Sequence, residues 1–156
     1  MGEHGTVRDT MEGRGLVMGA EDVALMIAHC LRAYPLEGCG LIATAPGSPV
    51  VERCYATRNA AESARLYTVH PLDHLRADRD AEEAGLVIAG VFHSHTHTDP
   101  YPSPTDVGQA PDPSWHYVLV SLRHEMPSIR SYRIVAGEIS EEALVVTSPH
   151  EVPSIG

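Results

Sequence analysis

Basic residues are scarce in this chain of 156 residues. Lys and Arg together number 11 against 21 Asp and Glu, which gives a net charge of -10 with the histidines neutral, and no run of basic residues occurs. Nucleic acids and anionic membranes attract proteins through clustered positive charge. We therefore expect neither of them as a partner.

Long apolar segments are also missing. The longest apolar windows stop well short of the roughly 20 residues that a membrane-spanning helix needs. The first residues, MGEHGTVRDTMEGRG, contain no apolar core of the kind that a signal peptide has. The sequence therefore predicts a cytoplasmic protein.

Cysteine is sparse. Cys30, Cys39 and Cys54 are an odd number of thiols and contain no Cys-x-x-Cys pair. Neither a disulfide framework nor a zinc site built from thiolates is therefore expected. We interpret the three cysteines as small buried residues.

Repeats and low-complexity linkers are absent as well. A chain of 156 residues has the length of one ordinary domain, which can bury a core without disulfides or a structural metal. We expect a disordered tail over residues 1–14, one domain over residues 15–148 and a C-terminal tail over residues 149–156.

The spacing of apolar residues predicts two main helices and one substantial sheet. Residues 21–34 have apolar side chains at helical spacing until Pro35, and residues 71–85 begin with Pro71 and end with Gly85. Strand-like runs cover residues 39–44, 50–57, 65–69, 86–92, 116–122, 128–135 and 138–146. This mixed order predicts an α+β or mixed α/β fold.

The most informative segment is VFHSHTHTDPYPSPTD, residues 91–106. His93 and His95 stand at the end of the predicted strand 86–92, and side chains two apart on a strand point to the same face. The two imidazoles can therefore share a cation. With Asp106 they would form the two-imidazole, one-carboxylate set of a catalytic zinc, which leaves the fourth position for water.

Most other metal motifs fail on spacing. A metallo-β-lactamase needs His-x-His-x-Asp-His, but His97 and Thr98 occupy the last two positions. Amidohydrolase barrels need about 250 residues, a cupin needs a Glu shortly after the histidines, and the His-Glu-x-x-His motif of helical zincins is absent. A metal-binding regulator with an all-imidazole site of His93, His95 and His97 stays open.

One spacing matches a known family. Residues 93–106 read His-Ser-His-x7-Ser-x2-Asp, which resembles the signature of the JAMM (MPN+) metallopeptidases. The resemblance extends over roughly residues 15–146, and no motif residue departs from the pattern. It implies a single-domain JAMM fold, in which a curved mixed β-sheet is sandwiched by helices as in cytidine deaminase.

The resemblance also implies roles for five residues. One zinc per chain would be bound by His93, His95 and Asp106. Glu37, in YPLEGCGLI, stands where the family has an upstream glutamate that transfers protons and does not bind the metal. Ser103 would donate a hydrogen bond to the oxyanion of the tetrahedral intermediate.

Simpler interpretations accompany these roles. Glu37 is alternatively a surface residue beyond the helix, and Ser103 is a good N-cap for a short helix starting at Pro104, which is compatible with an oxyanion role. Cys39 lies two residues after Glu37, so it either lines the cleft or packs in the core. The other polar residues of the segment are expected around the site and outside its chemistry: Ser94, Thr96, His97, Thr98 and Tyr101.

Within this family, the segments EGCG, HYVLVSL and SYRIVAG resemble the small bacterial Mec-type hydrolases, which act on ubiquitin-like sulfur-carrier proteins. This implies a zinc hydrolase that cleaves the amide bond after the carrier's C-terminal Gly-Gly and releases cysteine from a carrier–cysteine adduct, a step of cysteine biosynthesis. The alternatives are trimming of a carrier precursor, another isopeptidase or deubiquitinase-like activity, and a non-catalytic metal-binding or scaffold module. The oligomeric state is not indicated.

Overall fold

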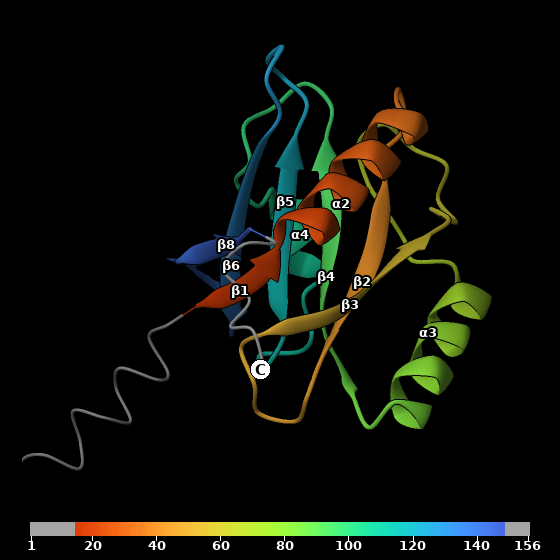
Figure 1. The fold of residues 1–156 in the computed structure, drawn as a ribbon. Coiled ribbons are helices and arrows are strands. Elements are labelled where there is room, and N and C mark those ends of the chain that lie inside the picture. Colours follow the sequence, from red (N-terminus) through yellow and green to blue (C-terminus); the bar gives the residue numbers. More distant parts are fainter. Residues whose placement is uncertain (1–14, 149–156) are drawn as a thin grey trace, which may run out of the picture.

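The computed structural model describes residues 15–148, so both predicted tails lie outside the described residues. Figure 1 shows the elements along the chain. They are β1 (Leu16–Gly19), α2 (Ala20–Ala33), β2 (Cys39–Thr44), β3 (Val51–Thr57), α3 (Pro71–Glu83), β4 (Val87–His95), α4 (Pro104–Gly108), β5 (His116–Ser121), β6 (Ser128–Val135), β7 (Glu138–Glu142) and β8 (Leu144–Thr147).

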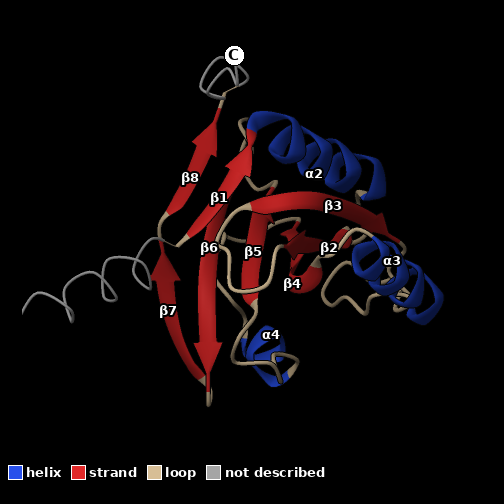
Figure 2. Cartoon of the chain, turned by 60° about the horizontal axis from the view of Figure 1, so that its bottom comes forward, coloured by secondary structure: helices blue, strands red, loops and turns tan. Residues whose placement is uncertain are grey.

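Six strands form one mixed sheet in the order β3-β2-β4-β5-β6-β7, and β1 and β8 form a second, two-stranded sheet. In the large sheet only β4 and β5 run parallel, and the connection between them carries the histidine-rich loop and α4. Figure 2 shows α2 and α4 on opposite sides of this sheet. The predicted mixed fold, one sheet between helices, is confirmed. No helix within residues 15–148 is both long and apolar enough to span a bilayer.

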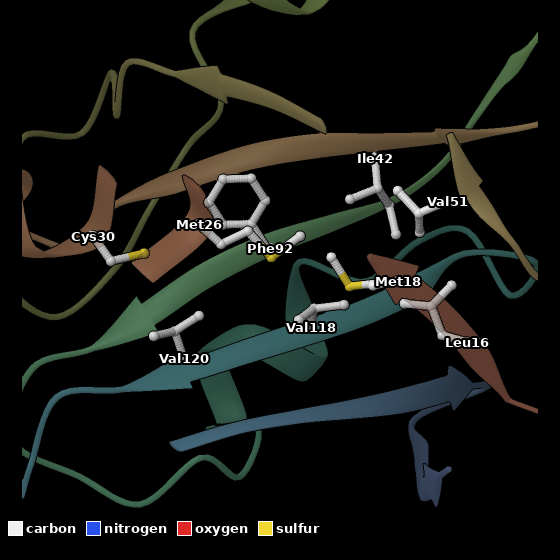
Figure 3. Packing of buried hydrophobic residues seen from close by; sticks show 9 residues of the cluster. All are labelled: Leu16, Met18, Met26, Cys30, Ile42, Val51, Phe92, Val118 and Val120. Atoms are coloured by element: carbon white, nitrogen blue, oxygen red, sulfur yellow. The ribbon is translucent and has the colours of Figure 1, made fainter. Parts of the chain in front are cut away.

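Side chains of the central strands are buried on both faces because each face has its own cover. On one face α2 and β1 enclose a core of nine buried residues (Figure 3): Leu16, Met18, Met26, Cys30, Ile42, Val51, Phe92, Val118 and Val120. On the other face α3 and the segment before it cover a second core: Cys39, Leu41, Tyr67, Ala77, Val91, Tyr117, Leu119, Tyr132 and Ile134.

Both predicted helices are present, but the apolar face of α2 was overestimated. Met26 and Cys30 are buried, whereas Leu31 and Tyr34, which continue the same helical spacing, are 53% and 48% exposed. The sheet contacts only a narrow stripe of the helix. The remaining apolar side chains at its C-terminal end therefore lie on the surface.

Two predicted strands were wrong. Residues 65–69 form no strand, and only an isolated bridge joins Val69 to Asn59. The Asn59 side chain forms hydrogen bonds with the Leu66 carbonyl and the Thr68 N–H, which a neighbouring strand would otherwise bind. Residues 138–146 form two strands, since the chain leaves the large sheet at Ala143 and β8 pairs with β1. The sequence analysis missed β1, which is only four residues long.

The elements that carry the predicted site are confirmed. β4 ends at His95 and lies between β2 and β5, and the layers that cover the two faces of the sheet bury its C-terminal residues. α4 begins after Ser103, whose side chain accepts a hydrogen bond from the Asp106 N–H while the Asp106 carboxylate accepts one from the Ser103 N–H. This capping box fixes the position of Asp106 relative to the strand end.

Candidate metal centre

Three of the predicted ligands converge at the end of β4. The Asp106 Oδ2 atom lies 2.9 Å from His95 Nε2 and 3.2 Å from His93 Nε2. All three side chains are at least 94% buried, with exposed fractions of 2% for His93, 6% for His95 and 5% for Asp106. The strand places both imidazoles on one face, and the capped first turn of α4 places the carboxylate against them.

Glu37 reaches the same point from the start of β2. One carboxylate oxygen of Glu37 and one ring nitrogen each of His93 and His95 lie within 4.8 Å of one another. Glu37 is buried, with 3% of its surface exposed, which excludes the interpretation of a surface residue beyond the helix. Two carboxylates, from Glu37 and Asp106, thus surround the histidine pair.

The donor atoms fit a divalent transition metal. Among the described residues, Glu37 Oε2 and both ring nitrogens of His93 are buried without a hydrogen bond. Buried polar atoms are normally satisfied, so such a group points to a missing partner. Two imidazole nitrogens with carboxylate oxygens are ligands that zinc accepts. Residues His93, His95 and Asp106, with Glu37 beside them, are therefore suited to hold zinc.

The local electrostatics differ between the groups of the site. Burial works to lower the pKa of His95, but the contacts with Asp106 and the Asp99 carbonyl outweigh it and raise that pKa. Burial lowers the pKa of His93, so its ring is neutral. Burial works to raise the pKa of Asp106, but the close contacts of its carboxylate with the His93 and His95 rings outweigh it and hold that pKa well below its usual range. Burial, with the Asp106 charge as a second cause, raises the pKa of Glu37 to about 7.

Neighbouring groups orient the two histidines. The Asp99 carbonyl lies 2.9 Å from His95 Nδ1 and can only accept, so Nδ1 carries the proton and Nε2 is the ring nitrogen available to a metal. The His93 ring stacks on Tyr67, with centroids 4.2 Å apart and an interplanar angle of 22°. The sequence analysis missed Tyr67, and no local signal could have found it because it lies 26 positions away in the chain.

Ser94 fixes the backbone at Gly38, between Glu37 and the start of β2. Its Oγ accepts a hydrogen bond from the Gly38 N–H at 2.8 Å, and its own N–H donates to the Gly38 carbonyl at 2.9 Å. Ser94 points away from the imidazoles, as the strand alternation predicted. Its contacts fix the backbone next to Glu37 against the backbone next to His93 and His95.

The segment of residues 58–70, here called the 58–70 loop, holds Glu37 from the other side. The Asn59 Nδ2 group donates to the carbonyls of Glu37 and Leu66, both at 3.1 Å. Its Oδ1 accepts from the N–H groups of Ala61 and Thr68 at 3.0 and 2.9 Å. Asn59 therefore ties both halves of the loop together and to Glu37, a role that the sequence did not reveal.

A cleft opens beside these groups. Its volume is about 510 Å³, and its lining residues are Glu37, Ala64, Arg65, His95, Thr96, His97, Thr98 and Ser103. A neighbouring hollow shares part of this wall and is lined by His95, His97, Thr98, Asp99, Tyr101, Ser103 and Arg123. Ser103 belongs to both, so a substrate bound over the histidines would pass next to it. A larger cavity of about 880 Å³ lies elsewhere, between residues near Gly15 and His116, and contains none of these groups.

The remaining predicted neighbours lie around the cleft. The His97 ring is exposed and contacts Thr96 Oγ1 at 2.8 Å and the Tyr34 hydroxyl at 3.4 Å, away from the other two imidazoles. Cys39 is fully buried, with its Sγ 3.4 Å from Thr57 Oγ1, and is a core residue that does not line the cleft. The structure thus offers no support for an all-imidazole site.

The sequence of this chain is similar to those of known proteins. A family model described as "Prokaryotic homologs of the JAB domain" matches residues 19–135. The chain is 42% identical over 139 residues to the CysO-cysteine peptidase of Mycobacterium tuberculosis, covering 86% of this chain and 93% of that protein. It is 34% identical over 120 residues to the "Probable TtuB-protein conjugate cleaving protease" of Thermus thermophilus, covering 76% of this chain and 74% of that protein.

Solved structures of other proteins have a similar fold. Protein DSY2949 from Desulfitobacterium hafniense is 30% identical and superposes with a TM-score of 0.79, covering 87% of this chain and 97% of that one. AF2198, a JAB1/MPN domain protein from Archaeoglobus fulgidus, has a TM-score of 0.56 at 16% identity, with 85% and 97% covered. The second likeness concerns the fold alone.

Proposed function

Because this chain belongs to the prokaryotic JAB-domain family, we propose that it is a zinc-dependent JAMM hydrolase that cleaves the amide bond after the C-terminal Gly-Gly of a ubiquitin-like sulfur-carrier protein. The observation that carries the chemistry is a buried cluster of four side chains: Glu37, His93, His95 and Asp106. Polar atoms of Glu37 and His93 have no hydrogen-bond partner among the described residues, and Glu37 and His95 line a cleft. A non-catalytic scaffold would not need these four groups in one place.

His93, His95 and Asp106 are the proposed metal ligands. Asp106 is preferred to Glu37 as the carboxylate ligand because its Oδ2 already contacts the Nε2 atoms of both histidines. When bound, zinc supplies a Lewis acid that makes water nucleophilic near neutral pH and polarises the scissile carbonyl.

Glu37 is the proposed proton carrier. A general base must release its proton again within the same reaction, which works best when its pKa lies near the working pH. Burial raises the pKa of Glu37 to about 7. Glu37 takes the proton from the attacking water and gives it to the departing amine, so the amine leaves as a neutral group.

Ser103 is the proposed oxyanion donor. It lines the cleft with Glu37 and His95, and its Oγ accepts the Asp106 N–H, so its position is fixed by the helix start. Its hydroxyl proton stays available to the oxygen that becomes negative as the carbonyl is attacked. N-capping and oxyanion stabilisation are compatible, since the two roles use different atoms of the same hydroxyl.

The substrate is proposed from the names of the relatives. One is a CysO-cysteine peptidase and another is named for cleaving TtuB-protein conjugates. Glycine residues have no side chain, so a Gly-Gly tail can approach the cleft floor closely. Release of cysteine from a carrier–cysteine adduct is the favoured reaction, because the relative of that name is 42% identical and covers 86% of this chain.

The test compares two substrates. CysO, the carrier in the relative's name, is prepared with a C-terminal Gly-Gly-Cys or with a longer extension, and the products are weighed by intact-mass spectrometry. Loss of one cysteine residue from the first supports release of cysteine. Cleavage of the longer tail alone supports precursor trimming. If neither is cut while an isopeptide-linked conjugate is, the carrier assignment is wrong and only a zinc isopeptidase remains.

A further inference from the structure

The cleft contains one arginine that the proposed chemistry does not use. We infer that Arg65 binds the free α-carboxylate of the residue that is released, which makes the enzyme selective for a carrier extended by a single residue. This inference rests on the proposed function and specifies the substrate class of the same site.

Among residues 15–148, Arg65 is the only arginine or lysine that lines the cleft of Glu37, His95 and Ser103. Its side chain is exposed, and no ion pair or side-chain hydrogen bond joins it to another residue in the described part of the chain. Four other arginines of the fold form ion pairs: Arg53 with Asp80, Arg58 with Asp73, Arg123 with Asp99 and Arg130 with Glu141. The guanidinium of Arg65 is therefore free for an anionic ligand.

Ser63 connects Arg65 to the proton carrier. The Glu37 N–H donates to the Ser63 carbonyl at 2.8 Å, and the Arg65 N–H donates to Ser63 Oγ at 3.0 Å. On the other side of Arg65, the Leu66 carbonyl accepts from Asn59, which also binds the Glu37 carbonyl. The backbone on both sides of Arg65 is thus fixed to the backbone of Glu37.

This position corresponds to the leaving-group side of the cleft. In the proposed reaction Glu37 protonates the departing amine, so that amine must lie next to Glu37. In a released amino acid one carbon atom separates the amine from the carboxylate. The group that binds the carboxylate must therefore also lie on the side of Glu37, where Arg65 is held.

Arg123 does not meet this requirement. It lines the neighbouring hollow, which contains Tyr101 and Ser103 but not Glu37, and its guanidinium is paired with Asp99 at 2.9 Å.

Charge also favours a cation here. The protein carries a net charge of -10, and the carboxylates of Glu37 and Asp106 stand at the reaction centre. Bound zinc would offset the two carboxylates at the reaction centre, but a substrate that ends in a carboxylate still approaches a protein of strongly negative net charge. Guanidinium binds a carboxylate through two parallel hydrogen bonds, which offsets the repulsion and fixes the direction of the chain end.

The experiment measures kcat/KM on CysO that ends in Gly-Gly-Cys. The terminal cysteine carries a free carboxylate in one substrate and a carboxamide in the other. The pair has nearly the same shape and differs in charge. We expect wild type to prefer the acid by about 10- to 100-fold, the range that a hydrogen bond to a charged group gives. Arg65→Gln should reduce the ratio to about one, and Arg65→Lys should restore part of it because the charge returns without the bidentate geometry.

Two control variants separate a local from a general effect of removing an arginine. Arg76→Gln, on the exposed side of α3, and Arg123→Gln should both keep the preference for the acid. Equal rates of wild type on acid and amide, or an equal loss on both substrates in Arg65→Gln, would overturn the inference while leaving the proposed function standing. Loss of the preference in Arg123→Gln alone would overturn it as well. If wild type cleaves neither form and is active only on isopeptide conjugates, the proposed substrate is wrong and the inference falls with it.

Discussion

At the scale of single residues, the site contains two buried carboxylates with different surroundings. The Asp106 carboxylate contacts two imidazoles and accepts the Ser103 N–H, and its pKa is held low by its contacts with the histidines. Glu37 Oε2 has no hydrogen-bond partner among the described residues, and burial raises the pKa of Glu37 to about 7. Surroundings that lower the pKa of one carboxylate and raise that of another indicate that the first stays charged and the second carries protons.

The ligand assignment predicts which substitutions remove the metal. Asp106→Ala deletes a carboxylate that contacts both histidines, so the purified variant should hold far less zinc than the roughly one ion per chain expected for wild type. His97→Ala should keep the wild-type content because His97 contacts Thr96 and Tyr34 instead. Elemental analysis of the purified proteins measures both. Metal retained in Asp106→Ala and lost in His97→Ala would replace the proposed site by a three-histidine one.

The proton-carrier assignment predicts a separation of binding from catalysis. Glu37→Gln keeps the shape of the side chain but cannot accept a proton, so kcat should fall by about 10²- to 10⁴-fold while zinc content and thermal unfolding stay close to wild type. Glu83→Gln, an exposed residue of α3, serves as the matched control and should keep full activity. Loss of zinc from Glu37→Gln would show that Glu37 is itself a ligand.

At the scale of elements, the 58–70 loop completes a site that the sheet only begins. β4 supplies His93 and His95, and α4 supplies Asp106. The loop adds the Tyr67 ring stacked on His93 and a backbone hydrogen bond to Glu37. Side chains proposed for the chemistry are thus also held by an irregular segment.

Asn59 is the residue whose loss should loosen this arrangement. Asn59→Ala removes four hydrogen bonds of 2.9–3.1 Å, including the one to the Glu37 carbonyl. We expect a loss of about 2 kcal/mol in the free energy of unfolding and a lower kcat, with zinc content unchanged. Urea unfolding and steady-state kinetics, both at a temperature where the variant is folded, measure these effects.

Asn59→Asp tests whether the amide donor of Asn59 is what matters. It retains the oxygen that accepts from Ala61 and Thr68 but loses the donor to Glu37 and Leu66, so kcat should fall here too, with a smaller loss of stability. A wild-type kcat in both variants would remove Asn59 from the positioning of Glu37.

At the scale of the whole molecule, we expect the fold to form without the metal. Two hydrophobic cores, one on each face of the large sheet, contain none of the proposed ligands. Chelation with EDTA should therefore lower the midpoint of thermal unfolding and leave the transition cooperative, since zinc stabilises only by binding the native state.

Added zinc should restore the midpoint in wild type and have little effect in Asp106→Ala, which lacks a proposed ligand. Differential scanning calorimetry with and without chelator gives both results. Collapse of the far-ultraviolet circular dichroism on chelation would show that the metal is structural.

The sequence by itself determined the elements whose signals are local. Helical spacing before Pro35, the apolar strand before His93, and Ser103 followed by Pro104 as a helix start each depend on residues a few positions apart, and each is present in the structure. The His-x-His spacing also placed the two imidazoles on one face, because strand geometry alone decides that.

Only the tertiary structure decided how distant segments meet. Tyr67 contacts His93, Asn59 binds the Glu37 backbone, and Arg65 lines the cleft, although these partners lie 22 or more positions apart in the chain or share no sequence pattern. Residues 138–146 divide between two sheets because the partner of β8 is β1, at the other end of the chain. These contacts join segments that are distant in the chain, and no periodicity within one segment encodes them.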